Sequence, residues 1–71
     1  MTKVDTLGLR KFLVDRRIFT ARDLARVCGM SNPTAERVMR GESRPSAKVM
    51  YAIVDVLNMP GEVAGRIFFS R

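Results

Sequence analysis

The sequence has few of the residues that reinforce small folds by covalent bonds or metal. Among its 71 residues there is one cysteine, Cys28, and there is no histidine. A single thiol cannot form an internal disulfide, and without histidine none of the common zinc-ligand sets can be assembled. We therefore expect no metal site, and we expect Cys28 to be a small buried residue rather than a reactive thiol. Stability must come from packing of the hydrophobic residues, which make up 46% of the chain. Association with a second copy could add to it, and a homodimer is the default expectation.

The same shortages exclude whole classes of function. Without histidine, and with no pair of carboxylates set against a nucleophile, the chain has no recognisable catalytic constellation. We expect it not to be an enzyme and to need no cofactor or small-molecule ligand. No run approaches the ~20 apolar residues that cross a bilayer, and the first residues lack the basic-then-apolar layout of a signal peptide. These features predict a cytoplasmic protein with no membrane partner.

Positive charge is in excess and is unevenly distributed. The formal net charge is +6, and residues 1–48 contain eleven basic and five acidic side chains, whereas residues 49–71 contain two of each. A polyanion would therefore face the first two thirds of the chain. The last third is left for the core and for contacts with protein.

Helix-forming patterns predict an all-α fold of four or five short helices. The chain has no repeat, linker or clear strand, and its length predicts a single domain over 1–71, with no space for a second, ligand-sensing domain. Leu9, Phe12 and Leu13 place apolar groups at i, i+3 and i+4. This spacing predicts an amphipathic first helix over about residues 6–17.

Capping residues predict where three further helices begin and end. Serine, threonine and asparagine side chains satisfy the free amides of a first turn, and glycine or asparagine closes a last turn in the left-handed conformation. The expected N-caps are Thr20, either Ser31 or Asn32, and Ser46. The expected ends are Gly29, Gly41 and the run that begins at Asn58. The clearest core stripe lies before that run, at Met50, Ile53, Val54 and Leu57.

The last segment is compatible with two structures. Residues 62–69 form either a fifth helix or, because Ile67, Phe68 and Phe69 favour extended structure, a short terminal strand. Of the two, the helix is favoured. Phe68 and Phe69 cannot both be buried easily in so small a core, so we expect one of them to contact a second subunit. Residues 58–71 are therefore the candidate surface of a homodimer.

The region 21–40 has the residue sizes that a helix-turn-helix requires. Two short helices must cross closely if the second is to project into a DNA groove, so small residues are needed at the crossing and in the turn. Ala25 and Gly29 meet these needs. The other inward positions are apolar, namely Leu24, Cys28, Met30, Ala35 and Val38. Seven positions with defined spacing therefore agree.

With this pattern the sequence resembles the Cro and CI class of phage repressors, the XRE type of helix-turn-helix. The resemblance covers roughly residues 9–57 and is carried by Leu9 to Ile18, Thr20 to Ala25, Cys28 to Ser31, Arg40-Gly41, Pro45-Ser46 and Leu57. It implies a compact lambda-repressor-like domain, usually dimeric, that binds palindromic operators and represses transcription. Two residues depart from the family: Ala21 replaces a glutamine that often contacts phosphate, and Pro33 replaces a small polar residue that contacts a base. We therefore expect fewer direct base contacts and more use of DNA shape.

The first turn of a recognition helix points into the major groove, and this predicts which side chains meet base edges. They are Asn32, Pro33, Thr34, Glu36 and Arg37. Asn32 suits adenine and Arg37 suits guanine, each through two hydrogen bonds, while Pro33 suits a thymine methyl group. Two alternatives stay open: Asn32 as an N-cap, and Glu36 in an ion pair with Arg40.

Phosphate contacts are expected from helix N-termini and from the loop after the recognition helix, where members of the family grip the DNA backbone. The residues concerned are Thr20, Arg22, Arg40, Ser43, Arg44, Ser46 and Lys48. Such contacts position a protein without reading sequence. The basic face of the first helix either extends this surface or is simply solvated; it consists of Arg10, Lys11, Arg16 and Arg17.

The leading interpretation is a Cro-like or immunity-type repressor that binds double-stranded operator DNA as a homodimer. An antitoxin of the same fold would also bind a toxin protein, and an excisionase-like protein would bend DNA and carry a strand hairpin. A protein-interaction module would apply the third helix to another protein. This last alternative is disfavoured because the exposed recognition positions are polar or charged rather than large apolar anchors.

Overall fold

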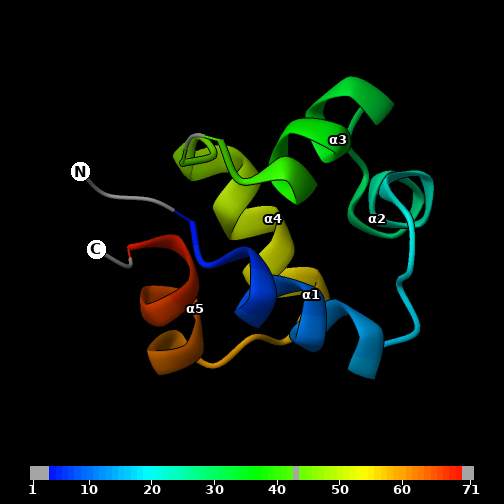
Figure 1. The fold of residues 1–71 in the computed structure, drawn as a ribbon. Coiled ribbons are helices and arrows are strands. Elements are labelled where there is room, and N and C mark those ends of the chain that lie inside the picture. The colour runs from blue at the N-terminus through cyan, green and yellow to red at the C-terminus, as the bar shows by residue number, and fades with distance from the viewer. Residues whose placement is uncertain (1–3, 43, 70–71) are drawn as a thin grey trace.

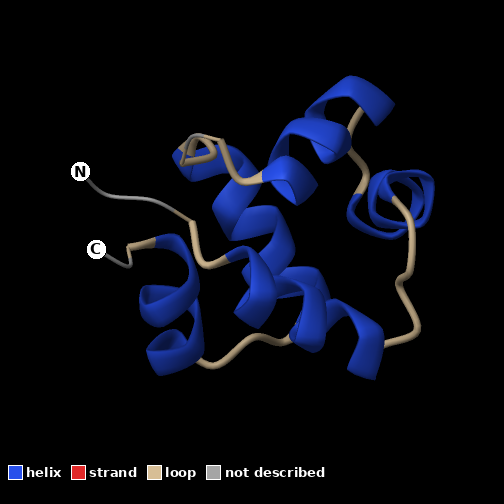
Figure 2. Ribbon diagram, in the orientation of Figure 1, coloured by secondary structure: helices blue, strands red, loops and turns tan. Residues whose placement is uncertain are grey.

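Five helices follow one another in the computed structural model, which describes residues 4–42 and 44–69 (Figures 1 and 2). They are α1 (Thr6–Asp15), α2 (Ala21–Cys28), α3 (Asn32–Arg40), α4 (Ala47–Leu57) and α5 (Gly61–Phe68). The described residues contain no strand, and the prediction of an all-α fold is confirmed. Within this part of the chain, no helix is long and apolar enough to cross a membrane.

The last segment is helical, and the alternative of a terminal strand is wrong. Ile67 and Phe68 are buried, and Val63 and Ala64 lie half-buried against the core one turn earlier. Two adjacent pairs spaced by four residues form one face of a helix, and burial of this face outweighs the β propensity of the neighbouring aromatic residues. Phe69 follows the helix and is 49% exposed, so only one of the two phenylalanines enters the core, as predicted.

Side-chain caps begin four of the five helices. Asp5 accepts a hydrogen bond from the backbone amide three residues further on at 3.0 Å. Thr20, Ser31 and Ser46 do the same at 3.1, 3.3 and 3.3 Å. Ser31, rather than Asn32, is therefore the N-cap of α3. Each bond satisfies one of the amides that a helix leaves unpaired at its start.

Residues in the left-handed conformation end the helices and redirect the chain. Gly29 and Gly41 end α2 and α3 with φ of 69° and 66°, and Asn58 ends α4 with φ of 56°. Helix α1 ends at Asp15, before the predicted end at about residue 17. It stops there because Arg17 adopts a φ of 60° and turns the chain, so that the next residue, Ile18, is buried.

All five helices contribute to the same hydrophobic core. Its most deeply buried side chains are Leu9 and Leu13 from α1, Leu24 from α2, Ala35 from α3, Ile53 from α4 and Phe68 from α5. Figure 1 shows α4 in the middle of the bundle, with α2 and α3 toward one side and α5 toward the other. Cys28 is buried as predicted, and this burial raises the pKa of its thiol. The core thus holds α3 at one margin of the molecule.

Candidate nucleic-acid interface

Helices α2 and α3 cross closely over small side chains. The turn between them consists of residues 29–31, from the left-handed C-cap of α2 to the N-cap of α3. Ala25 of α2 and Ala35 of α3 are buried, and side chains with only a Cβ let these two packed helices approach closely. Of the other positions in the pattern, Leu24, Cys28 and Val38 are buried and Met30 is half-buried against the core. The packing pattern predicted for a helix-turn-helix is therefore present.

The outer face of α3 carries the side chains that the sequence assigns to base contacts. Asn32, Pro33, Glu36 and Arg37 are exposed, and Thr34 is half-buried. All five lie on one short helix whose inner face is held by Ala35 and Val38. Figure 1 shows α3 at the margin of the bundle, and Arg40 in its last turn is exposed as well.

The N-cap of α3 determines what its first residues can do. The Ser31 hydroxyl accepts from the Thr34 amide at 3.3 Å and lies 2.7 Å from the Thr34 hydroxyl. Thr34 is therefore engaged within the cap, which reduces its freedom to meet a base. Asn32 takes no part in the cap and keeps its exposed side-chain amide for a partner outside the chain. The alternative of Asn32 as N-cap is wrong.

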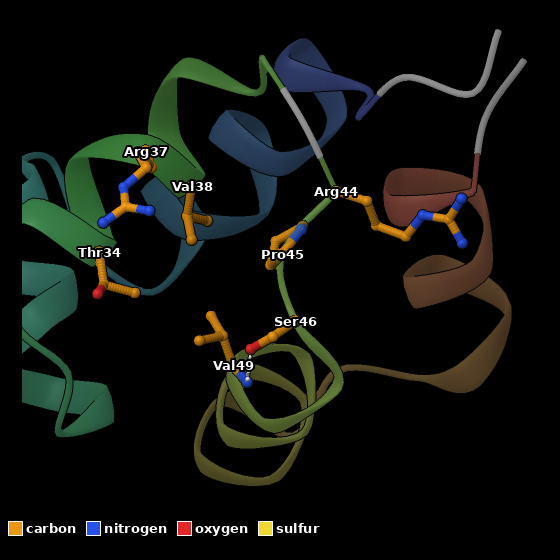
Figure 3. Close-up of a pocket in the computed structure, with 7 residues that line it drawn as sticks. All are labelled: Thr34, Arg37, Val38, Arg44, Pro45, Ser46 and Val49. Carbon is orange, nitrogen blue, oxygen red and sulfur yellow. Dashed lines mark hydrogen bonds between the residues drawn. The ribbon is translucent and has the colours of Figure 1, made fainter.

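A surface hollow separates α3 from the start of α4 (Figure 3). Its volume is about 220 Å³, and it is lined by Thr34, Arg37, Val38, Arg44, Pro45, Ser46 and Val49. Valine and proline side chains provide apolar lining, and Arg37 and two hydroxyl groups provide polar groups, while the guanidinium group of Arg44 extends away toward α5. Such a combination suits a phosphate or the edge of a sugar more than an uncharged ligand.

The two arginines of the hollow are oriented differently (Figure 3). Arg37 lies along α3 with its guanidinium group near Thr34. Arg44 extends from the loop toward α5, where its Cζ lies 4.6 Å from the centroid of the Phe69 ring. This is a cation–π distance. Arg44, which the sequence assigns to phosphate, is thus held by an aromatic ring in the free chain.

The remaining residues assigned to phosphate have separate local environments. Ser46 accepts the amide hydrogen of Val49 at 3.3 Å, and its own hydroxyl hydrogen is still available to a phosphate at the N-terminus of α4. Arg22 and Lys48 are exposed. Ser43 lies outside the described residues.

The N-terminus of α2 carries a negative charge beside the expected phosphate contacts. The hydrogen bond with the Thr20 side chain holds the pKa of Asp23 below its ordinary value, and Arg26, 3.4 Å away, acts in the same direction. The ionised Asp23 stabilises the first turn of α2 but repels phosphate. Arg22 on the same turn is exposed and places a positive charge beside this carboxylate.

At the end of α3, Arg40 has a different ion-pair partner from the intrahelical one expected from the sequence. Arg40 Nε lies 3.1 Å from Oε1 of Glu42, two residues along the chain, and not against Glu36. The left-handed Gly41 turns the chain back so that Glu42 comes within reach of the last residue of α3. Both partners are exposed, so the pair contributes little to stability. Glu36 therefore keeps an exposed carboxylate.

The basic residues of α1 and of the chain directly after it do not share one environment. The Nε of Arg16 donates to the Leu57 carbonyl oxygen at 2.8 Å, and its Cζ lies 3.6 Å from the centre of the Phe12 ring. Arg10, Lys11 and Arg17 are exposed.

The sequence did not predict two features of the hollow. They are the aromatic partner of Arg44 and the apolar lining by Val38, Pro45 and Val49. Proline after Arg44 and valine one turn after the Ser46 cap were the available signals.

Comparison with known proteins agrees with this geometry. A family model described as helix-turn-helix (HTH_3) matches residues 9–63, which include all of α2, α3 and α4. No curated protein and no solved structure matches the chain significantly.

Proposed function

This chain belongs to the XRE-type helix-turn-helix family of sequence-specific DNA-binding regulators, and we propose that it is a Cro-like or immunity-type repressor. In this proposal α3 enters the major groove of operator DNA, and the bound protein obstructs polymerase. The supporting observation is the outer face of α3, where Asn32, Glu36 and Arg37 are exposed beside the cation-lined hollow. A helix that binds protein would instead present large apolar anchors on this face.

Two side chains are proposed to carry most of the direct readout. Asn32 is released from capping by Ser31, so both polar atoms of its amide are available to adenine N6 and N7. Arg37 lies on the outer face one turn further along, where it can reach guanine O6 and N7. Pro33 and Thr34 are proposed to contribute less to base readout. Pro33 has no polar side-chain atom and can make only van der Waals contacts, and the Thr34 hydroxyl is engaged with the cap.

Phosphate contacts are proposed on both sides of α3. Thr20 and Arg22 lie at the start of α2, and Ser46 and Lys48 lie at the start of α4. Arg40 is proposed to exchange its exposed partner Glu42 for a phosphate, since solvent already weakens that ion pair. With ~3 to 4 phosphates neutralised per subunit, affinity should fall steeply as salt rises.

A homodimer is part of the proposal. Tyr51 on α4 and Phe69 after α5 are exposed, and both belong to residues 49–71, where charges balance. Two copies joined there would present two α3 helices to successive turns of DNA. Half-sites centred about 10 to 10.5 base pairs apart are expected for such an arrangement.

Selection of bound duplexes from random DNA tests this function directly. The expected result is enrichment of a symmetric site whose half-site spacing matches one helical turn. Failure to enrich any sequence, with equal retention of all duplexes, would exclude a sequence-specific repressor. An antitoxin would still select a site but would copurify with a second protein. The hairpin of an excisionase does not occur within residues 4–42 or 44–69, which are helical or irregular.

A further inference from the structure

The contact between Arg44 and Phe69 joins two surfaces of the molecule. Arg44 lines the hollow beside α3, and Phe69 lines a groove of about 290 Å³ between α4 and α5. The two side chains meet with the Arg44 Cζ 4.6 Å from the ring centroid. Figure 3 shows the arginine leading from the hollow to α5. The proposed DNA-binding face and the groove therefore share one side-chain pair.

The groove suits a second copy of the chain. Its lining side chains carry no charge, and Tyr51 and Phe69 at its edge are 71% and 49% exposed. Two copies that each carry a formal charge of +6 repel one another wherever their basic surfaces meet. All the lining residues except Ala47 belong to residues 49–71, where basic and acidic residues balance, so this repulsion is small at the groove once Arg44 has left the Phe69 ring.

Arg44 and Phe69 each have a second partner in this arrangement. An operator phosphate competes with the Phe69 ring for the guanidinium group of Arg44. A second copy seated in the groove would compete with Arg44 for the ring, because Phe69 lines the groove. Phosphate binding by Arg44 and docking of a second copy against Phe69 are therefore both favoured when Arg44 and Phe69 are separated.

Resting on the proposed function, we propose that Phe69 holds Arg44 away from DNA in the free subunit and that docking of a second copy in the α4/α5 groove releases Arg44 to the operator. Self-association and DNA binding then promote each other, and the coupling is reciprocal by thermodynamic linkage. An exposed cation–π contact corresponds to about two- to five-fold in an equilibrium constant, so this is the expected coupling per subunit.

The first test measures binding to a short duplex that contains a single selected half-site. The protein concentration is kept below the range in which the chain self-associates. Phe69→Leu keeps apolar bulk but removes the aromatic face. We expect it to tighten binding by about two- to five-fold. The slope of log K against log salt concentration should become steeper by up to the amount that one phosphate contact contributes. In an Arg44→Gln background the same substitution should have no effect, and Phe69→Tyr, which keeps the ring, should bind as the parent chain does. Unchanged or weaker binding by Phe69→Leu would overturn the proposal.

The second test needs no DNA. Sedimentation equilibrium of Arg44→Gln should show stronger self-association than that of Lys48→Gln, which removes the same charge but not a ring partner. The expected difference is about two- to five-fold per subunit. Equal association of the two variants, or a chain that stays monomeric at all concentrations, would overturn the coupling. If the parent chain bound no duplex at all, the proposed function itself would be contradicted. Failure of the coupling and failure of the proposed function are therefore distinguishable.

Discussion

Arg16 Nε donates a hydrogen bond of 2.8 Å to the carbonyl oxygen of Leu57, a residue 41 positions later in the chain. Leu57 is the last residue of α4, where helix carbonyls have no partner within the helix and the helix dipole is negative. The same guanidinium group covers the Phe12 ring at 3.6 Å. A single arginine after the end of α1 therefore joins the C-terminal ends of two helices.

Arg16→Ala should lower the free energy of unfolding by about 1 to 2 kcal/mol, because it removes both a charged hydrogen bond and a cation–π contact at a partly exposed site. Urea denaturation measures the change. Arg10→Ala, at an exposed position on α1, is the matched control and should stay within about 0.5 kcal/mol of the parent chain. Equal effects of the two substitutions would show that the Leu57 contact contributes nothing.

Ser31 and Asn32 should separate stability from DNA binding. Ser31→Ala removes the N-cap of α3 and should cost about 1 kcal/mol of stability. Asn32→Ala should leave stability within about 0.5 kcal/mol and instead weaken binding to the selected site by about 1 to 3 kcal/mol. Denaturation and binding titrations of both variants check this. A larger stability loss for Asn32→Ala than for Ser31→Ala would contradict the cap assignment.

Arg37 and Arg44 should affect DNA binding in different ways. Arg37→Ala should relax specificity at one base pair, with a loss of about 1 to 3 kcal/mol of discrimination there. Arg44→Ala should weaken binding to selected and random duplexes about equally and reduce the salt slope by about one contact. Titrations on the selected site, its single-base variants and random DNA distinguish the two. Equal losses for both variants on every duplex would refute the assigned roles.

Asp23 should give α2 a stability that depends on pH. Its pKa is lowered from an ordinary value of 3.8, first by the hydrogen bond with the Thr20 side chain. A carboxyl group with a lowered folded-state pKa stabilises the fold fully above its unfolded pKa, and this contribution is lost as pH falls below 3.8 through the lowered value. Asp23→Asn should therefore unfold with a weaker dependence on pH in that range than the parent chain. An NMR titration that finds the Asp23 carboxyl at or above 3.8 would disagree with this prediction.

Local patterns explain most of the agreement between the predicted and observed helices. Thr20 and Ser46 cap helices because their hydroxyl groups meet amides only three residues away. Gly29 ends α2 because a residue without Cβ enters the left-handed conformation at low cost. Interactions this short depend on sequence alone, so they can be recognised before the tertiary structure is known.

Where the local sequence was compatible with two structures, tertiary packing decided which one forms. Ser31 and Asn32 are both good caps, and the start of α3 is set by the way Ala35 and Val38 must face the core. The β propensity of Ile67, Phe68 and Phe69 was outweighed when α5 buried the first two of them. Arg40 meets Glu42 because a left-handed turn at Gly41 brings the chain back.

The sequence by itself determined the helix-turn-helix, since that unit depends on seven small or apolar residues at fixed short spacing and on caps within the same segment. Tertiary structure alone decided which arginines are available to DNA. Arg16 is bound to Leu57, and Arg44 lies against Phe69, 25 positions later, whereas Arg37 stays on the exposed face of α3. The physical reason is distance along the chain: charged side chains are long and flexible, and partners that are remote in sequence come within reach only when the helices pack.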